Sequence, residues 1–296
     1  MKKHQQEKLG ELLIGLQVLF QAFWPVGAHY GATQMPQIQF MAYITLLSSV
    51  LFLGISFYRR EFKSLWSLKI LGPLMLYTLL CVLPYGIIVY ATRYSSAIET
   101  TLLIQSEVVF ALLFGWMFLQ EKISKNKLIG ILFSLLANVL ILYNGGFEFK
   151  WANLALFLAP IFFVLANSIA KNLQKEGLSW SIILSFRMTI GGILLLLSAH
   201  LLEGLEAPPI QLLPFLFCFA FFVFGLGKIL WQMALHRLDL SKITALGLST
   251  PAISLLIAFL WLGEVPSLIQ GLGILSVCVG AGFLLKTHSK QWVELD

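Results

Sequence analysis

The chain has 296 residues, of which 58% are hydrophobic and only 11% are charged, and its mean hydropathy is +0.86. A soluble domain has about a quarter of its residues charged and could not bury this much apolar surface, so the bilayer must be the solvent of this fold. The net charge of +6 does not indicate a nucleic-acid-binding protein, because the charges lie in short segments between apolar stretches.

Ten apolar stretches are long enough to be transmembrane helices, since a spanning helix needs about 20 mostly apolar residues. Short polar turns separate them, and we therefore expect an all-α integral membrane protein. In chain order, the predicted spans lie near 10–28, 37–57, 70–91, 97–119, 126–143, 151–171, 180–201, 211–235, 241–262 and 267–286.

The second half of the chain repeats the first at an offset of 143 positions: Ser106 aligns with Ser249, and Gly130 aligns with Gly273. Such a repeat indicates two copies of one five-helix unit, which we place at 1–145 and 146–296. Because five is an odd number, the second unit crosses the membrane in the opposite sense. Two inverted five-helix repeats are the usual plan of a secondary transporter that works by alternating access.

The distribution of Lys and Arg predicts the orientation of the chain. Sixteen of the 20 lie at the two termini or in the four predicted loops on the same side, whereas Arg93 and Lys150 lie on the other side. The positive-inside rule then places both termini in the cytoplasm. We expect an integral protein of a prokaryotic inner (plasma) membrane.

Neither metal nor cofactor chemistry is indicated. The three cysteines lie in different apolar spans, the five histidines are scattered, and the chain has no nucleotide-binding loop of the GxxxxGK[ST] type. We therefore expect no cofactor and no enzymatic activity.

One motif set carries a family resemblance. The run Trp231–Leu235 (WQMAL), followed by Ser249–Pro251 and Leu262–Glu264, resembles the "W..AL … P … LGE" pattern of ten-helix EamA-type transporters in the drug/metabolite transporter superfamily. Phe23 and Trp24 also resemble an early aromatic motif of that family. The resemblance covers nearly the whole chain and implies transport of a small metabolite. The acids that end the two LGE-like motifs, Glu121 and Glu264, are expected to bond backbone amides of the next helix.

Glu107 is the sharpest single signal. It is predicted near the middle of the span 97–119, roughly 12 Å from each interface by helix rise. A carboxylate at that depth costs several kcal/mol unless it is paired, protonated or facing a wet cavity. It could couple protons or bind a substrate amine, or it could pair structurally with Arg187 or Lys228. Its repeat equivalent is Thr250, so only one acid is expected at the midplane, and we favour a facilitator without obligatory proton coupling.

Two cations fall within spans. Lys228 aligns with Tyr85 of the first repeat and replaces the aromatic residue that the family more often has there. In a cavity it would favour a substrate with a carboxylate, and the alternative is a lysine that reaches the membrane surface. For Arg187 the resemblance implies a residue that ties helices together.

Other polar residues share helix faces that we expect to line the bundle interior. Together with the charged residues they form our candidate substrate-binding set, which is Glu107, Lys228, Gln17, Gln21, Trp24, Tyr85, Asn167, Arg187, Trp231, Gln232 and Thr250.

These observations predict a secondary transporter, either an exporter or a facilitator, of a small polar organic metabolite such as an amino acid or a related zwitterion. The alternative is a flippase for a lipid or a lipid-linked sugar, which would need a cavity open sideways to the bilayer. The sequence leaves open whether protons take part and whether the chain forms a homodimer.

Overall fold

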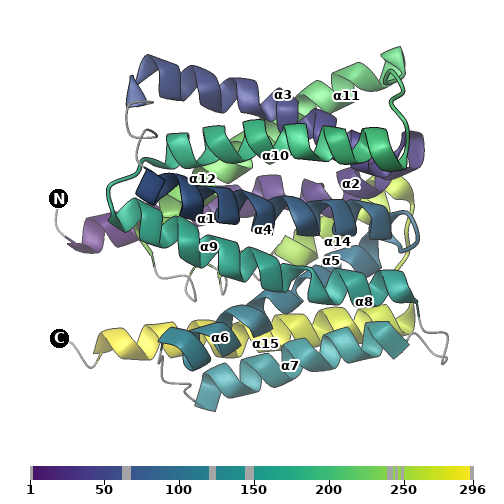
Figure 1. The fold of residues 1–296 in the computed structure, drawn as a ribbon. Helices are drawn as coiled ribbons and strands as arrows, with labels where there is room; N and C mark the ends of the chain where they lie inside the picture. The colour runs from purple at the N-terminus through teal and green to yellow at the C-terminus, as the bar shows by residue number, and fades with distance from the viewer. Residues whose placement is uncertain are drawn as a thin grey trace.

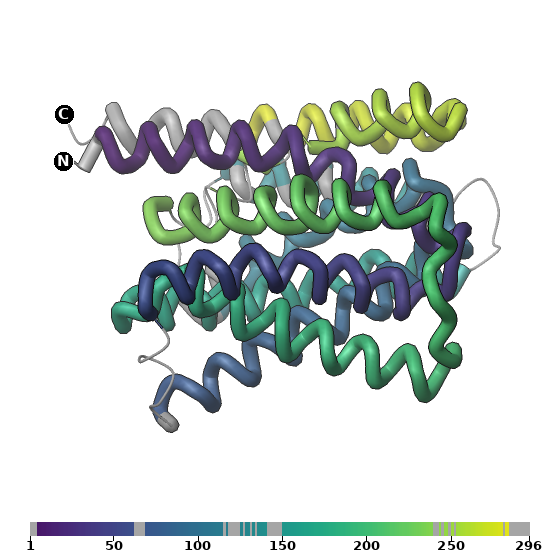
Figure 2. The backbone as a smooth tube through the Cα atoms, turned by 90° about the horizontal axis from the view of Figure 1, so that it is seen from above, coloured from purple at the N-terminus to yellow at the C-terminus, as the bar shows by residue number. Residues whose placement is uncertain are grey.

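The computed structural model of the chain describes residues 3–61, 68–119, 125–143, 150–238 and 250–293, together with 243, 246 and 247. Throughout this part the secondary structure is helical, and both ends of the chain lie on one side of the helix bundle (Figures 1 and 2). We refer to this as the terminal side. The predicted repeat boundary at 145 lies outside the described residues.

The helices follow one another in two comparable series. The first series is α1 (Lys3–Gln21), α2 (Phe23–Gln34), α3 (Gln37–Tyr58), α4 (Leu68–Thr92), α5 (Ala97–Ile104), α6 (Ser106–Leu119) and α7 (Lys125–Tyr143). The second is α8 (Trp151–Leu158), α9 (Pro160–Lys175), α10 (Trp180–Leu202), the short turn η2 (Ile210–Leu212), α11 (Leu213–Cys218), the π-helical segment η3 (Phe219–Leu226), α12 (Gly227–Leu235), α14 (Thr250–Leu262) and α15 (Leu268–Val293).

Among the described residues, seven helical segments are long and apolar enough to cross a membrane. Three shorter apolar helices, Leu128–Leu140, Ile253–Leu262 and Leu268–Gly280, complete the set. Each of the ten predicted spans therefore has a helical counterpart, and the all-α membrane fold is confirmed. The seven longer segments are Gln5–Gln34, Gln37–Tyr58, Lys69–Thr92, Ala97–Phe114, Trp151–Lys175, Trp180–Leu202 and Ile210–Leu235.

Equivalent helices of the two series run in opposite directions. The pair α1–α2 leads away from the terminal side and α8–α9 leads back towards it, and α3 and α10 are likewise antiparallel (Figure 1). The packing is reciprocal as well. Helix α3 packs on its equivalent α10 and α7 on its equivalent α15, while α4 packs on α9 as α12 packs on α1.

Three predicted continuous spans are interrupted. Two of the breaks have a proline as their cause. The first span breaks at Ala22, three residues before Pro25, and the sixth breaks at Ala159, directly before Pro160. Proline has no N–H to donate to the carbonyl four residues earlier, and its ring crowds that turn, so the helix bends or ends there.

The third break, at Gln105, separates α5 from α6 without a proline. The hydroxyl of Ser106 donates a 2.6 Å hydrogen bond to the backbone oxygen of Phe157 in α8. This bond connects the break in the first repeat to a point close to the break in α8–α9. Discontinuous helices of this kind leave backbone groups free beside cavities in many transporters.

The eighth predicted span also departs from a regular helix, because Phe219–Leu226 is π-helical. Helix α2 packs closely against this segment. A Cβ atom at Gly27 would lie 2.1 Å from the ring of Phe219, so only glycine allows α2 to sit against this segment. The π-helical segment ends at Leu226, two residues before Lys228, and such segments often occur at functional sites.

The equivalent helices α3 and α10 are joined at both ends by a carboxylate. On the terminal side, Glu61 accepts hydrogen bonds from the hydroxyls of Ser179 and Ser181 at the start of α10. On the opposite side, Glu203 accepts hydrogen bonds of 3.0 Å from the backbone N–H groups of Ile38 and Gln39 at the start of α3. We refer to these two contacts as the terminal clasp and the opposite clasp.

Candidate functional site

One cavity, with a volume of about 120 Å³, lies among helices of both repeats. Its lining comes from α1, α2, α4, α5 and α6 of the first repeat and from α9, α10, α12 and α14 of the second. Ten of the eleven candidate residues line it, namely Gln17, Gln21, Trp24, Tyr85, Glu107, Asn167, Arg187, Lys228, Trp231 and Thr250.

Gln232 is the exception, because it does not line the cavity. Its side chain is fully buried, donates to the hydroxyl of Tyr77 at 3.0 Å and accepts from Gln174 at 2.6 Å. One helical turn beyond Lys228, it therefore joins α12 to α4 and α9 behind the cavity wall.

Arg187 is 5% exposed and is held by two tyrosines of α4. It donates to the hydroxyl of Tyr77 at 2.9 Å and to that of Tyr85 at 2.6 Å. Its guanidinium carbon also lies 5.4 Å and 5.2 Å from the two ring centroids, within the range of a cation–π interaction. Arg187 thus ties α10 to α4 and brings a positive charge to the cavity wall.

Lys228 brings a second positive charge into the same cavity. Its Nζ atom lies 5.7 Å from the ring centroid of Tyr85 and 5.7 Å from that of Phe224. The ammonium group therefore lies over two aromatic rings, and the residue lines the cavity.

Glu107 lies in the first turn of α6, just after the break at Gln105. The N-terminus of a helix carries a partial positive charge, which favours a carboxylate in this position. Lys228 and Glu107 line the same cavity. Within the described part of the chain, however, neither Lys228 nor Arg187 lies within 4.0 Å of its carboxylate.

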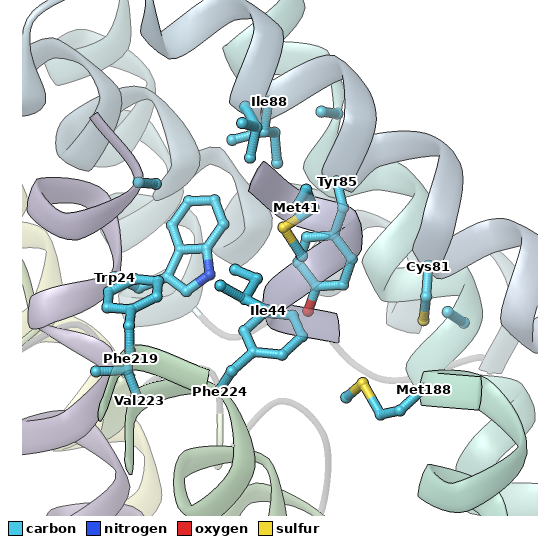
Figure 3. Close-up of a cluster of buried hydrophobic side chains, with 14 of the residues drawn as sticks. Trp24, Met41, Ile44, Cys81, Tyr85, Ile88, Met188, Phe219, Val223 and Phe224 are labelled. Carbon is cyan, nitrogen blue, oxygen red and sulfur yellow. The ribbon is translucent and has the colours of Figure 1, made fainter. Parts of the chain in front are cut away.

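Tyr85 lines the cavity and lies among aromatic rings, and Figure 3 shows it with Trp24 and Phe224. Its ring centroid is 4.9 Å from that of Phe163, 5.2 Å from that of Phe224 and 6.3 Å from that of Trp24. Both cations approach the same ring, so Tyr85 connects the charged and the aromatic parts of the site.

Comparison with known proteins identifies the family. The model of the EamA-like transporter family matches residues 8–143 and again residues 150–286. The chain belongs to the EamA-like transporter family. The two matches also give this EamA-like transporter the two-repeat architecture that the offset of 143 positions predicted. They make it an integral membrane transporter of the drug/metabolite transporter superfamily.

Two further proteins are similar to this EamA-like transporter. An uncharacterized transporter of Methanothermobacter thermautotrophicus is 24% identical over 201 residues, which make up 66% of this chain but only 58% of that protein. The crystal structure of another protein superposes with a TM-score of 0.73 at 14% identity, and the match covers 93% of this chain and 94% of that one. This second similarity shows the fold alone.

Sequence reasoning missed several residues at this site of the EamA-like transporter. Tyr77 and Cys81 precede Tyr85 by eight and four residues and share one face of α4 with it, and Cys81 lines the cavity. This spacing is the signal that could have found them. Hydropathy alone does not reveal this spacing, because tyrosine and cysteine also occur in apolar cores.

Glu264, the acid of the second LGE-like motif, bonds backbone amides, but not those of the next helix. It accepts hydrogen bonds of 3.1 Å from the N–H groups of Ala97 and Ile98 at the start of α5, in the other repeat. Its repeat equivalent, Glu121, lies outside the described residues.

Proposed function

We propose that this EamA-like transporter is a secondary transporter of a small zwitterionic metabolite, such as an amino acid, and that it works by alternating access. One observation carries the proposal. A single cavity is lined by one acid, Glu107, and two cations, Lys228 and Arg187, and the acid is not ion-paired with either cation.

Charges inside a membrane protein are costly unless they have partners. A zwitterion supplies an ammonium group for Glu107 and a carboxylate for the cationic side of the cavity, so it offsets both costs at once. A purely cationic or purely anionic molecule would satisfy one side and leave the other unpaired.

The inverted repeats support alternating access. Both repeats line the cavity, and equivalent helices run in opposite directions. Two similar half-structures of opposite orientation can exchange conformations and open a central cavity first to one side and then to the other. In such a transporter the substrate gradient would decide between export and uptake.

The test is flux in liposomes with the purified protein. Three matched series, built on alanine, leucine and phenylalanine, would each contain the amino acid, its α-amide and the deaminated carboxylic acid. We expect counterflow of at least one amino acid, and much weaker flux of its amide and of its deaminated acid.

Two pairs of variants relate the flux to the cavity. Glu107→Gln and Lys228→Met should each reduce it strongly, whereas the same exchanges at exposed sites, Glu206→Gln and Lys150→Met, should not. Equal flux of all three members of a series, or movement of a fluorescent lipid between leaflets in place of amino-acid flux, would contradict the proposal.

A further inference from the structure

The indole of Trp24 carries a hydrogen-bond donor without an acceptor. Trp24 is 4% exposed and lines the cavity, yet its Nε1 atom has no hydrogen-bond partner among the residues that the structure describes. Buried donors are nearly always satisfied in native proteins, so an unpaired one facing a cavity points to a ligand. The other tryptophan of this cavity differs, because Trp231 donates to the side-chain oxygen of Asn167 at 3.4 Å.

The hydroxyl of Tyr85 supplies a second free donor. Its oxygen accepts the 2.6 Å hydrogen bond from Arg187. Arginine has only donors, so the hydroxyl proton of Tyr85 must point elsewhere, and none of the described side chains accepts it. Since Tyr85 lines the cavity, this proton is available to a bound molecule.

Lys228 adds the third donor at the same place. Its ammonium nitrogen lies 5.7 Å from the ring centroid of Tyr85, and the rings of Trp24 and Tyr85 are 6.3 Å apart. Figure 3 shows the indole of Trp24 beside Tyr85. Three donors, one of them charged, are therefore grouped at Tyr85: its own hydroxyl, the indole of Trp24 and the ammonium of Lys228. The acid of the cavity, Glu107, comes from the separate helix α6.

We propose that Trp24 Nε1, Tyr85 Oη and Lys228 Nζ form a subsite for the carboxylate of the transported molecule. A carboxylate has two oxygens with about four lone-pair positions, enough to accept from all three donors. Arg187 positions Tyr85 and remains bound to it. The inference rests on the proposed function and assigns the two ends of the zwitterion, with the ammonium group towards Glu107.

The substitution Trp24→Phe tests the subsite, with Trp231→Phe as a matched control. Both exchanges remove an indole from the same cavity, but only Trp24 has a free N–H. A hydrogen bond to a charged group is worth roughly one to two factors of ten in affinity. We expect Trp24→Phe to raise the KM of the transported amino acid about tenfold or more, with little change in the inhibition constant of its α-amide. Trp231→Phe should leave the ratio of these two constants unchanged.

A spectroscopic measurement on the unmodified protein serves as the second readout. In ¹⁵N-tryptophan-labelled protein, the indole N–H signal of Trp24 is assigned by its absence in Trp24→Phe. It should move downfield when the amino acid or its deaminated acid is added, and it should stay in place with the α-amide.

The outcomes separate the two proposals. If the unmodified protein transports none of the three series, the proposed function fails and this subsite fails with it. If the protein transports an amino acid but the ratio of constants is unchanged in Trp24→Phe and the indole signal does not move, only the carboxylate subsite is overturned.

Discussion

The guanidinium of Arg187 and the hydroxyl of Tyr85 form a 2.6 Å hydrogen bond that joins α10 to the cavity wall of α4. A second bond from the same guanidinium goes to Tyr77, which is fully buried and does not line the cavity. One arginine thus contacts two tyrosines, of which only Tyr85 can meet a substrate. Comparing substitutions at the two tyrosines therefore separates an effect on substrate binding from an effect on the fold.

Tyr85→Phe should weaken transport, whereas Tyr77→Phe should mainly weaken the fold. In Tyr85→Phe the carboxylate loses one donor, and we expect the KM of the amino acid to rise about tenfold. In Tyr77→Phe, Arg187 and Gln232 each lose an acceptor in the buried interior, which costs about 1–3 kcal/mol of stability. Flux in liposomes and thermal unfolding in detergent measure the two effects, and equal KM values in both variants would speak against the assignment.

Glu107→Gln should weaken substrate binding without removing any proton coupling. Among the described residues, Glu107 is the only acid that lines the cavity, and its repeat equivalent is Thr250. We therefore expect flux in the unmodified protein to be the same with and without an imposed pH gradient. The variant loses the charge that faces the substrate ammonium, and its KM should rise about tenfold. Uphill accumulation driven by a pH gradient, lost in Glu107→Gln, would show instead that the carboxyl group carries protons.

Lys228→Met should abolish the preference for a carboxylate. The methionine keeps much of the length and apolar character of the side chain but cannot donate to an anion. Lys228→Arg should retain part of the flux, because the charge survives while the compact ammonium is replaced by a planar guanidinium. Comparing the amino acid with its α-amide in each variant measures the preference, and Lys150→Met is the control. Full preference in Lys228→Met would remove this residue from the subsite.

Cysteine labelling should reach Thr33→Cys from outside the cell and should not reach Lys125→Cys. Thr33 is exposed at the rim of a hollow on the side opposite the termini, and Lys125 begins α7 on the terminal side. The excess of Lys and Arg predicts that the terminal side faces the cytoplasm. The measurement uses a membrane-impermeant maleimide on whole cells, with the unmodified chain as background for Cys81, Cys218 and Cys278. The reverse labelling pattern would invert the orientation.

Glu203→Gln should lower the melting temperature more than Glu206→Gln does. Glu203 accepts two backbone hydrogen bonds in the opposite clasp, and hydrogen bonds to a charged group contribute about 1.5–3 kcal/mol each. The side chain of Glu206 is exposed. Thermal unfolding of the purified variants in one detergent gives the comparison, and equal melting temperatures would show that the clasp does not stabilise the fold.

The helices and their antiparallel repeats were predictable from the sequence. Apolar stretches of about twenty residues and an alignment of the two halves at an offset of 143 positions both extend over many residues, so single polar residues or breaks do not obscure them. The grouping of charged and polar residues around one cavity followed from the high cost of charge inside a membrane. The break at Gln105 was not predictable, since no proline or glycine marks it and tertiary contacts such as the bond from Ser106 to α8 accompany it. Gln232 was misplaced because helical spacing from Lys228 fixes a face only approximately, and the neighbouring α4 and α9 turn that side chain away from the cavity.

The two clasps have a consequence for the energy balance of the transport cycle. Each places a carboxylate at the start of an antiparallel partner helix, one on each side of the membrane. If α3 and α10 keep both clasps, this helix pair stays rigid while the remaining helices tilt relative to it. Tilting in either direction then leaves the hydrogen bonds of both clasps intact. The free energies of the inward-open and outward-open states would then differ little in this part of the protein, so the two states would have similar populations and the apparent affinity for substrate would be similar on both sides of the membrane.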